Sequence, residues 1–563
     1  MRIRTRSAAA LTAGILATAG ISAGVVSAWP GDPTDFASVP AQPKTPGITL
    51  PNVLSPGLGE YVVAQGSTKL ENGVPCVQYY GYDATVPGSS DCSKQAPFLP
   101  LQPSGQEAQK TEPDKNTYLR LWGQTGADPS YDYGTHFLFQ GHEGGAPGYI
   151  TRINLDADAA HRVTLLATTE QDGKTPLPQF DGSTWDPWAK RLLFTYEGGS
   201  SGGVWQATAT VPSTVVNLQG IIGKAGYEGI QNDSAGDLWI VEDSGGRKGT
   251  VNTNAKQPNS FIYRFKPVDP TDLTKGGKLQ ALQVTSLRNP GQPIAFTPAT
   301  GSPTGAQADA DITSPDTQDL HTYGHTFATT WVTIHDTAVD GTTPFDAGAL
   351  AKKLRATPFK RPENGQFQPG TGFRTFFFDE TGDTDNTSQA IPDLGGFGDV
   401  QRLDQSSPTA DTGTLRLFYK SDQAHAGFDN VTFLSRTKVA FVEDAGDTLH
   451  TQRGALDSAY ALDTQVDYSA PSAPQPVRFI AEGRDPSATI DSAGGPLVAG
   501  NEGDNEITGI HASDGDPTRQ GILGAQIPTL FHGGWRLFWT QQHGDNETWE
   551  VVRTPGARHS WDG

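Results

Sequence analysis

The 563-residue chain has few positive charges and few long apolar runs, and each shortage excludes a class of partner. Lysine and arginine total 41 against 62 aspartates and glutamates. Nucleic-acid binding requires a basic surface, so we expect no nucleic-acid partner. Beyond residue 28 no stretch approaches the roughly 18 consecutive apolar residues of a membrane span, so we also expect no membrane partner.

Several catalytic signatures are missing as well. The sequence contains no HExxH, Walker-type or CxxC motif. Zinc-protease and P-loop chemistries therefore have no support. Convincing helical periodicity is also nearly absent, and only residues 346–356 (DAGALAKKLRA) have the spacing and composition of a helix.

The first 28 residues differ from the rest of the chain. Three arginines precede a run of apolar and small residues from 8 to 26, and the run closes on Val26-Ser27-Ala28. This pattern predicts a secretory signal peptide, residues 1–28, cleaved after Ala28, and hence a secreted, extracellular protein. The alternative is a retained membrane anchor, for which the Gly, Ala, Ser and Thr content is poor. Cleavage removes three arginines and no acid, which takes the net charge from −21 to −24.

The chain has only two cysteines, Cys76 and Cys92. In an exported protein the simplest interpretation is one local disulfide between them. The alternative is a metal held by a single thiolate. Both cysteines fall within residues 29–117, which are rich in Pro, Gly, Ser and Gln and which we interpret as an extended N-terminal arm.

Residues 118–563 have the sequence pattern of an all-β protein. Glycine (66) and proline (41) are abundant in the whole chain, and in this region short runs rich in Phe, Trp, Tyr, Val and Ile are each bounded by turn residues. Between 244 and 360 the segments PVDPTDLTKGGKL and TGSPTGAQADADITSPDTQD are expected to be loop insertions.

An internal repeat organises these strands. In each copy an acid follows an aromatic residue or proline, and 14 to 17 residues later a second acid ends a hydrophobic strand. A weaker fifth copy surrounds Glu506. The four clear copies run from Asp181 to Glu197, from Glu228 to Glu242-Asp243, from Glu363 to Asp379-Glu380, and from Asp429 to Glu443-Asp444.

A single repeat of short strands cannot bury its own apolar faces, so the repeats must pack against one another. This predicts a radially repeated β structure, and a six-bladed β-propeller with long loop insertions is the natural architecture. A β-sandwich is the alternative, but it gives no reason for the repeated acids. The expected blades open near His142-Glu143, Asp181, Glu228, Glu363, Asp429 and Glu506.

In a propeller, equivalent positions of successive blades meet at the centre, so the repeated acids are expected to converge. Converging carboxylates raise one another's pKa unless a cation joins them, and Ca²⁺ takes 6–8 oxygen ligands in irregular geometry. Taken singly, each acid also suits an Asx-type turn. Only one member of each strand-end doublet can face the axis. The predicted metal ligands are Glu143, Glu197, Glu228, Glu363, Asp429, Glu443 and Glu506.

Three further side chains are considered for catalysis, of which His335 and Arg361 are the predicted catalytic residues. His335 in WVTIHDT lies beside Asp336 and resembles half of an acid–base pair, as does His142 beside Glu143, although a histidine in a turn explains either. Arg361 in KRPENG has a planar guanidinium suited to an anionic substrate, and its alternative is a surface ion pair.

Ordered motifs between about Phe137 and Asn546 resemble the PhoX-type alkaline phosphatases. They are FQGHEGG, TYEGG after WDPW, YEGIQND, WIVEDSGG followed by FIYRFKP and DLTKGGKLQAL, ATPFKRPENG, and FDNVTF with FVEDAG. The resemblance implies a six-bladed propeller with a central calcium and iron site that hydrolyses phosphate monoesters outside the cytoplasm. It also implies that Arg361 is the arginine of the RPE triplet and that Glu143 is the acid of the family's HE pair. Acidic metal ligands are implied at Glu197, Glu228, Glu242 and Glu363.

The chain departs from this family at one position. Where the family reads Thr-Cys-Glu-Glu, with the cysteine on iron, this chain reads Thr195-Tyr196-Glu197-Gly198. Either the Tyr196 phenolate replaces the thiolate on Fe³⁺, or iron is absent and Ca²⁺ alone is kept.

We therefore expect a secreted, monomeric, calcium-dependent phosphoester hydrolase acting on a small phosphorylated substrate. Two alternatives remain: a lactonase-like hydrolase on a calcium propeller, and a non-catalytic extracellular calcium-binding propeller. Fold alone does not choose among them.

Overall fold

The computed structural model describes residues 33–44, 50–82, 110–145, 147–296, 304–383, 391–484, 506–542 and 545–554. Cys76 is fully buried. Its predicted partner Cys92 and the predicted signal peptide, residues 1–28, lie outside the described residues, so the disulfide and the cleavage site stay predictions. Within the described ranges, no helix combines the length and apolarity that a membrane crossing needs.

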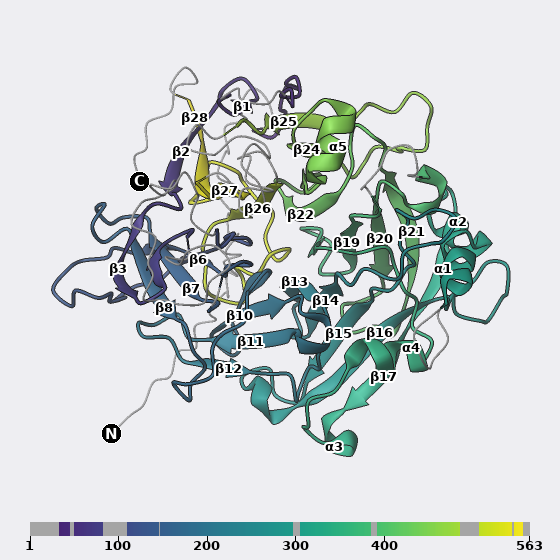
Figure 1. Cartoon of the computed structure of the whole chain (residues 1–563), viewed down its shortest axis with the longest axis horizontal. Coiled ribbons are helices and arrows are strands. Elements are labelled where there is room, and N and C mark those ends of the chain that lie inside the picture. The colour runs from purple at the N-terminus through teal and green to yellow at the C-terminus, as the bar shows by residue number, and fades with distance from the viewer. Residues whose placement is uncertain are drawn as a thin grey trace, which may run out of the picture.

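The chain is mainly β and its sheets are arranged like the blades of a propeller (Figure 1). The first two sheets are antiparallel meanders in chain order. One contains β5 (Thr117–Arg120), β6 (His136–Gln140), β7 (Ile150–Asn154) and β8 (Val163–Ala167). The other contains β9 (Ser183–Asp186), β10 (Arg191–Tyr196), β11 (Gly203–Ala207) and β12 (Val215–Asn217).

A nine-stranded sheet follows, in which two further meanders are joined through a long strand, β17 (Phe327–Asp336), that pairs with both β16 and β21. The first meander contains β13 (Tyr227–Asn232), β14 (Leu238–Glu242), β15 (Ile262–Pro267) and β16 (Gly277–Val284). The second contains β18 (Gly365–Phe367), β19 (Thr375–Glu380), β20 (Asp399–Gln405) and β21 (Thr412–Lys420).

The N-terminal arm completes the last two sheets. One consists of β22 (Phe428–Phe433), β23 (Lys438–Glu443), β24 (Ser458–Asp463) and β25 (Val477–Ala481), with β1 (Val53–Leu54) at its edge. The other consists of β26 (Glu506–Ser513), β27 (Arg536–Gln542) and β28 (Glu547–Arg553), with β2 (Leu58–Ala64) as its outer strand. A small hairpin of β3 (Lys69–Val74) and β4 (Val77–Tyr79) follows β2. Because β2 pairs with β28 along its length, the arm closes the ring between the two ends of the chain.

The first strand of each meander lies at the centre of the ring. The strands β5, β9, β13, β18, β22 and β26 contact one another in this order, and β26 returns to contact β5. The prediction of a propeller is therefore confirmed as a propeller-like ring of sheets, although β17 merges two meanders into one sheet.

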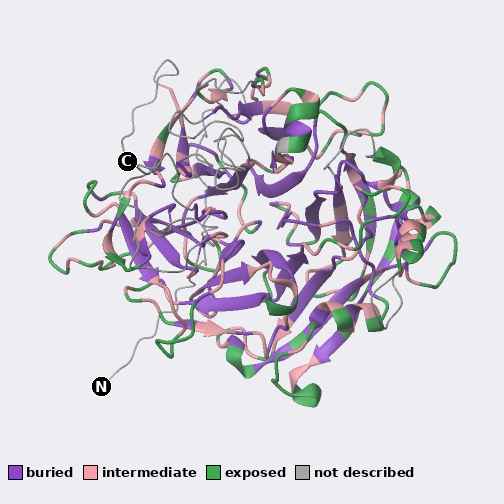
Figure 2. Cartoon of the chain, viewed as in Figure 1, coloured by how far each residue is buried: buried purple, intermediate pink, exposed green. Residues whose placement is uncertain are grey.

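Apolar side chains fill the spaces between neighbouring sheets, so the inner strands are buried and the exposed residues lie on outer loops and helices (Figure 2). Strand β10 shows how this arises from sequence. Leu192 and Phe194 pack toward the preceding sheet and Leu193 packs toward the following one. Successive side chains of a strand point to opposite faces, so a strand buried on both faces reads as the unbroken apolar run LLF.

The short helices lie outside the sheets: α3 (Thr337–Asp340), α4 (Ala347–Lys353) and α5 (Gly446–Arg453), with α1 and α2 in the insertion between β16 and β17. The helix predicted at 346–356 is confirmed by α4. The loop predicted over TGSPTGAQADADITSPDTQD is wrong, since that segment forms α1 (Gly305–Ile312) and α2 (Pro315–Leu320). Thr304 and Ser314 cap these helices, and helices this short show too few turns for their periodicity to be recognised.

Candidate metal centre at the hub

Acidic residues stand at two positions of nearly every meander, both at the same end of the ring. One position is the start of the innermost strand, and the other is the end of the second strand. These two positions adjoin because the strands are antiparallel. The starts carry Asp114, Asp181, Glu228, Glu363, Asp429 and Glu506. The ends carry Glu143, Glu197, Asp243, Asp379 and Asp444, and in the last sheet Gln542, which pairs directly with Glu506.

β-Bulges change the direction in which two of the strand-start side chains point. The β13–β14 register shifts between Tyr227 and Ile230, and the β22–β23 register shifts between Phe428 and Val431. Such bulges insert an unpaired residue and turn its side chain away from the regular pleat. The bulges contain Glu228 and Asp429, whose carboxylates therefore project to the hub.

The carboxylates form one continuous cluster, which we call the hub cluster. Groups of three have ligand oxygens within 4.8 Å of one another, and successive groups share Asp429, Glu363 and Glu197. The groups are Asp114–Asp429–Glu506, Glu228–Glu363–Asp429, Glu197–Asp243–Glu363 and Glu143–Asp181–Glu197.

The hub cluster has a deep tier and a shallow tier. The strand starts Asp114, Asp181, Glu228, Glu363 and Asp429 are buried. The strand ends Glu143, Glu197, Asp243 and Asp444 and the strand start Glu506 are only partly buried, whereas the strand end Asp379 is buried. A ligand that enters the hub therefore meets these partly buried carboxylates, the shallow tier, first.

Neutral polar side chains hold part of the deep tier in place. Asn364 donates from Nδ2 to Glu228 Oε1 at 2.8 Å, and its backbone N–H donates to Asp379 Oδ1 at 2.8 Å. Thr508 donates to Asp114 Oδ1 at 2.9 Å and Asp429 Oδ2 at 3.2 Å. Gln542 Nε2 bridges Asp114 Oδ2 at 3.1 Å and Glu143 Oε2 at 3.0 Å.

Arg361 is a basic side chain within the cluster. Its Nε and Nη2 contact the Asp243 carboxylate at 2.6–3.0 Å, and Nη2 lies 3.4 Å from Glu363 Oε1. Burial works to lower the pKa of Arg361, but the charges of Asp243 and Glu363 raise it well above its ordinary value, so the guanidinium stays charged. Its backbone has φ of 57°, a left-handed conformation that costs a residue with a side chain roughly 1–2 kcal/mol. Such strain is concentrated at functional sites.

Lys115 is a second basic side chain, fully buried beside the deep tier. Its Nζ donates to Asn430 Oδ1 at 3.3 Å. Burial lowers the pKa of Lys115, and the charges of Asp429 and Asp114 oppose that change.

The hub carboxylates repel one another because they are close together and buried. Burial, reinforced by neighbouring carboxylate charge, raises the pKa of Glu143 and of Glu363 to about 8. The pKa of Glu228 and of Glu506 is raised well above the ordinary value for the same two reasons. A hub of this composition either takes up protons or binds cations.

The donor set fits a hard cation. Glu228 Oε2 and Asp181 Oδ1 are buried and have no hydrogen-bond donor among the described residues. Buried carboxylate oxygens without a donor are costly unless a cation coordinates them. The gathered ligand atoms are all carboxylate oxygens, which is the ligand type that Ca²⁺ prefers.

The donor set does not supply the thiolate that the family resemblance places on iron. Tyr196, at that position, packs with Trp205 at a ring-centroid distance of 6.4 Å, and both join the apolar cluster between the first two sheets. The phenolate alternative therefore gains no support from the placement of the ring.

Two of the predicted ligands lie away from the cluster, and in each case the neighbouring aspartate faces the hub instead. Glu242 Oε2 accepts from Tyr263 Oη at 2.8 Å and the Phe261 N–H at 3.1 Å inside its own sheet. Glu443 pairs with Arg453, with Nη1 to Oε1 at 3.0 Å. Both glutamates end regular strands whose pleat points them away from the hub. Their predicted role as metal ligands therefore has no geometric support at the hub, where Asp243 and Asp444 lie instead.

The histidine candidates also lie elsewhere. His335 is on the long strand β17, stacked on Phe345 with centroids 3.6 Å apart, and its Nε2 donates to the Gly341 carbonyl at 3.1 Å. His142 is fully buried, stacks on Tyr149, and has a pKa lowered well below its ordinary value by burial. Both histidines are held by structural contacts, so the acid–base role predicted for His335 has no geometric support at the hub.

Comparison with known proteins agrees with this architecture. No protein-family model matches the chain, and no curated protein matches its sequence. The chain is similar to the solved structure of PhoX from Pseudomonas fluorescens in complex with vanadate, a transition state analogue. The TM-score is 0.52 and the identity 13%, over 93% of this chain and 99% of that one. The chain therefore has the fold of PhoX, which confirms the family resemblance at the level of structure.

Two weaker structural similarities add no argument, because their TM-scores are below 0.5. A putative phosphatase from Bacteroides thetaiotaomicron gives a TM-score of 0.35 at 11% identity, over 88% of this chain and 79% of that one. A putative oxidoreductase (glucose dehydrogenase) from Thermus thermophilus gives 0.33 at 11% identity, over 78% and 97%.

Proposed function

We propose that the protein is a secreted, calcium-dependent phosphomonoesterase and that the hub cluster is its active site. The observation that carries this proposal is the convergence of buried carboxylates, with Arg361 among them, at the centre of a PhoX-like ring. We also propose that the ring has six blades, with the nine-stranded sheet counting as two blades bridged by β17.

Ca²⁺ bound by the cluster would neutralise a phosphate and polarise its oxygens. The deep tier, with Asp181, Glu228 and Glu363, would hold the cation. Asn364 orients Glu228 through its 2.8 Å hydrogen bond. A small phosphomonoester would enter along the shallow tier, which is partly exposed.

Arg361 would orient the phosphate. Asp243 engages two of its guanidinium nitrogens and fixes the plane of the group. The third nitrogen, Nη1, then provides a directed cation for an anionic oxygen, which is the role for which arginine is better suited than lysine. In this arrangement Asp243 positions Arg361 and does not itself contact substrate.

The test uses the full-length exported protein. Bound metals are determined, and hydrolysis of p-nitrophenyl phosphate and bis-p-nitrophenyl phosphate is measured with and without a calcium chelator. We expect monoester turnover that the chelator abolishes and that added Ca²⁺ restores. A folded protein that retains calcium but turns over neither ester would refute the enzymatic proposal.

Matched variants separate catalysis from folding. Glu197→Gln keeps side-chain size and removes one charge from the cluster, so we expect activity to be lost while the thermal transition remains. Glu242→Gln makes the same change outside the cluster and should retain turnover. Equal activity in the two variants would contradict the assignment of the hub as active site.

One observation favours a second candidate, a non-catalytic extracellular calcium-binding propeller. The position that carries a cysteine in the family is Tyr196, which packs with Trp205 in an apolar cluster. Retained calcium without ester hydrolysis in the assay above would favour this candidate.

A further inference from the structure

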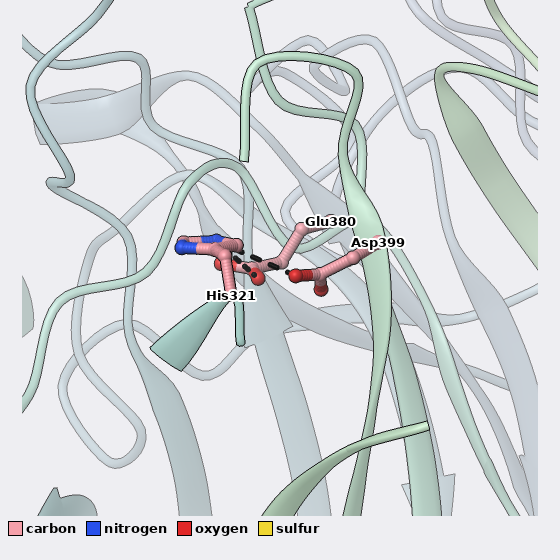
Figure 3. A group of neighbouring side chains, drawn as sticks. All are labelled: His321, Glu380 and Asp399. Carbon is pink, nitrogen blue, oxygen red and sulfur yellow. Dashed lines mark ion pairs between the residues drawn. The ribbon is translucent and has the colours of Figure 1, made fainter. Parts of the chain in front are cut away.

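A second cluster of ligand atoms lies outside the hub, where the insertion helix α2 meets β19 and β20. It consists of His321, which follows α2, Glu380 at the end of β19 and Asp399 at the start of β20 (Figure 3). All three residues are buried, with side-chain exposures of 3%, 1% and 0%. Glu380 directly follows Asp379 of the hub, and the alternation of the strand sends the two carboxylates in different directions.

The hydrogen bonds of His321 define which ring nitrogen is available. Nδ1 lies 2.7 Å from the Thr317 carbonyl oxygen, which can only accept, so Nδ1 carries a proton. In the neutral imidazole Nε2 then has a lone pair, and it faces the carboxylates of Glu380 and Asp399. Both Nε2 and Glu380 Oε2 are buried without a hydrogen-bond partner among the described residues.

The distances match a shared ion better than a shared proton. Nε2 lies 3.3 Å from Glu380 Oε2 and 3.4 Å from Asp399 Oδ2. A charge-assisted N–H···O hydrogen bond is usually about 2.7–2.9 Å long. Two ligands bound at about 2.0–2.1 Å in a tetrahedral zinc site lie roughly 3.3–3.4 Å apart.

The surrounding residues orient the ligands and keep space beside Nε2. The Lys360 N–H donates to Glu380 Oε1 at 2.7 Å, which leaves Oε2 toward the histidine. Gln401 Nε2 lies 3.3 Å from both oxygens of Asp399. Gly395 has φ of 73°, and a Cβ there would come within 2.3 Å of His321 Nε2, so a side chain at this position would fill the space beside the nitrogen. Metal-binding histidines typically donate their other ring N–H to a backbone carbonyl, as Nδ1 does to Thr317.

We propose that His321, Glu380 and Asp399 form a tetrahedral site for a divalent transition metal of the Zn²⁺ class, with a water molecule at the fourth position. The ion would fasten the α1–α2 insertion to β19 and β20. This site is separate from the calcium proposed at the hub and does not depend on the protein being a phosphatase.

The test uses Co²⁺ as a spectroscopic probe on the metal-stripped full-length protein. Tetrahedral Co²⁺ with a nitrogen ligand absorbs strongly in the visible range, whereas octahedral Co²⁺ among carboxylates absorbs weakly. We expect one equivalent of the strongly absorbing form, bleached by one equivalent of Zn²⁺. No intense bands in the wild-type protein would overturn the proposal.

Variants assign the bands to the site. His321→Gln should abolish them and Glu380→Gln should weaken Co²⁺ binding at least tenfold, whereas the hub variant Glu506→Gln should keep the spectrum. Unchanged bands in His321→Gln would overturn the proposal. If that variant does not fold, as judged by circular dichroism, Glu380→Gln decides the outcome in the same way.

Discussion

The stability of the metal-free protein should fall as the pH rises, and the Ca²⁺ proposed at the hub should change this dependence. Burial, reinforced by the charge of Asp243, raises the pKa of Glu363 from 4.5 to about 8 when no cation is bound. Between those values the folded protein holds a proton that the unfolded chain releases. Stability from this group is therefore present below about pH 4.5 and is lost as the pH rises toward 8.

The expected effect is large for one side chain. A difference of one bound proton changes the free energy of unfolding by about 1.4 kcal/mol per pH unit. Glu363 has a side-chain exposure of 7%, so solvent screens it little. From pH 5 to pH 7 this group alone contributes a loss on the order of 3 kcal/mol, against the total of roughly 5–15 kcal/mol for a typical domain. The neighbouring carboxylates titrate as a coupled set, so their effects do not simply add.

Bound Ca²⁺ should reverse this trend, because ligation keeps Glu363 ionised in the folded state and favours higher pH. The assay is urea denaturation of chelator-treated protein at several pH values between 5 and 8, with and without saturating Ca²⁺. Glu363→Gln should flatten the slope only in the metal-free series. Glu242, whose pKa burial raises to about 7, lies outside the cluster, so Glu242→Gln should reduce the slope in both series. A metal-free protein whose stability is independent of pH, or unaffected by Ca²⁺, would refute the reasoning.

Three other predictions concern separate parts of the molecule. Arg361→Lys replaces the two-nitrogen contact with Asp243 by a single point charge and should lower phosphatase turnover about tenfold or more, as measured with p-nitrophenyl phosphate; unchanged turnover would remove Arg361 from the site. Lys115→Met removes a buried positive charge beside Asp114 and Asp429 and should raise Ca²⁺ affinity about tenfold in calorimetric titration, whereas weaker binding would contradict the electrostatic argument. N-terminal sequencing of the exported protein should begin at Trp29, and an intact Met1 would contradict cleavage after Ala28.

The sequence predicted the repeated acids at the hub because their positions are fixed by local pattern. Glu197 follows an apolar strand and Glu228 opens one, and the ring of sheets brings both to the centre. The sequence also showed that only one member of each doublet faces the axis. It did not show which member, because that depends on which face each strand end turns to the hub. Local sequence also does not show where a bulge re-directs a strand start such as Glu228 or Asp429. The bulges between Tyr227 and Ile230 and between Phe428 and Val431 are set by tertiary packing and carry no local signal.

Other features could not be predicted from the sequence because they depend on contacts between segments that are far apart in the chain. Asp114 lies in a stretch that resembles an unstructured arm, and its place at the hub follows from β5, which begins three residues later. The pairing of β2 with β28 joins residues nearly 500 positions apart, and no periodicity in either segment indicates the partner. The cluster around His321 was hidden for the same reason, because Glu380 of β19 and Asp399 of β20 come close to this histidine only in the folded chain.

The distribution of donors within the hub indicates where the proposed cation would lie. On the side of Asp114 and Asp429, carboxylates receive hydrogen bonds from Thr508 and Gln542 and the charge of Lys115. On the side of Asp181 and Glu228, one oxygen of each carboxylate has no donor among the described residues. A cation is stabilised most where the carboxylate charge is least compensated.

The side with Asp181 and Glu228 should therefore contribute more to calcium binding. Glu228→Gln should weaken Ca²⁺ binding more than Asp114→Asn, although both remove one buried negative charge from the same ring. Titration of the two metal-free variants with Ca²⁺ measures the difference directly. Because Asp114 already accepts hydrogen bonds from neutral side chains, its amide replacement disturbs the cation little; an equal or larger loss of affinity for Asp114→Asn would place the ion on the Lys115 side.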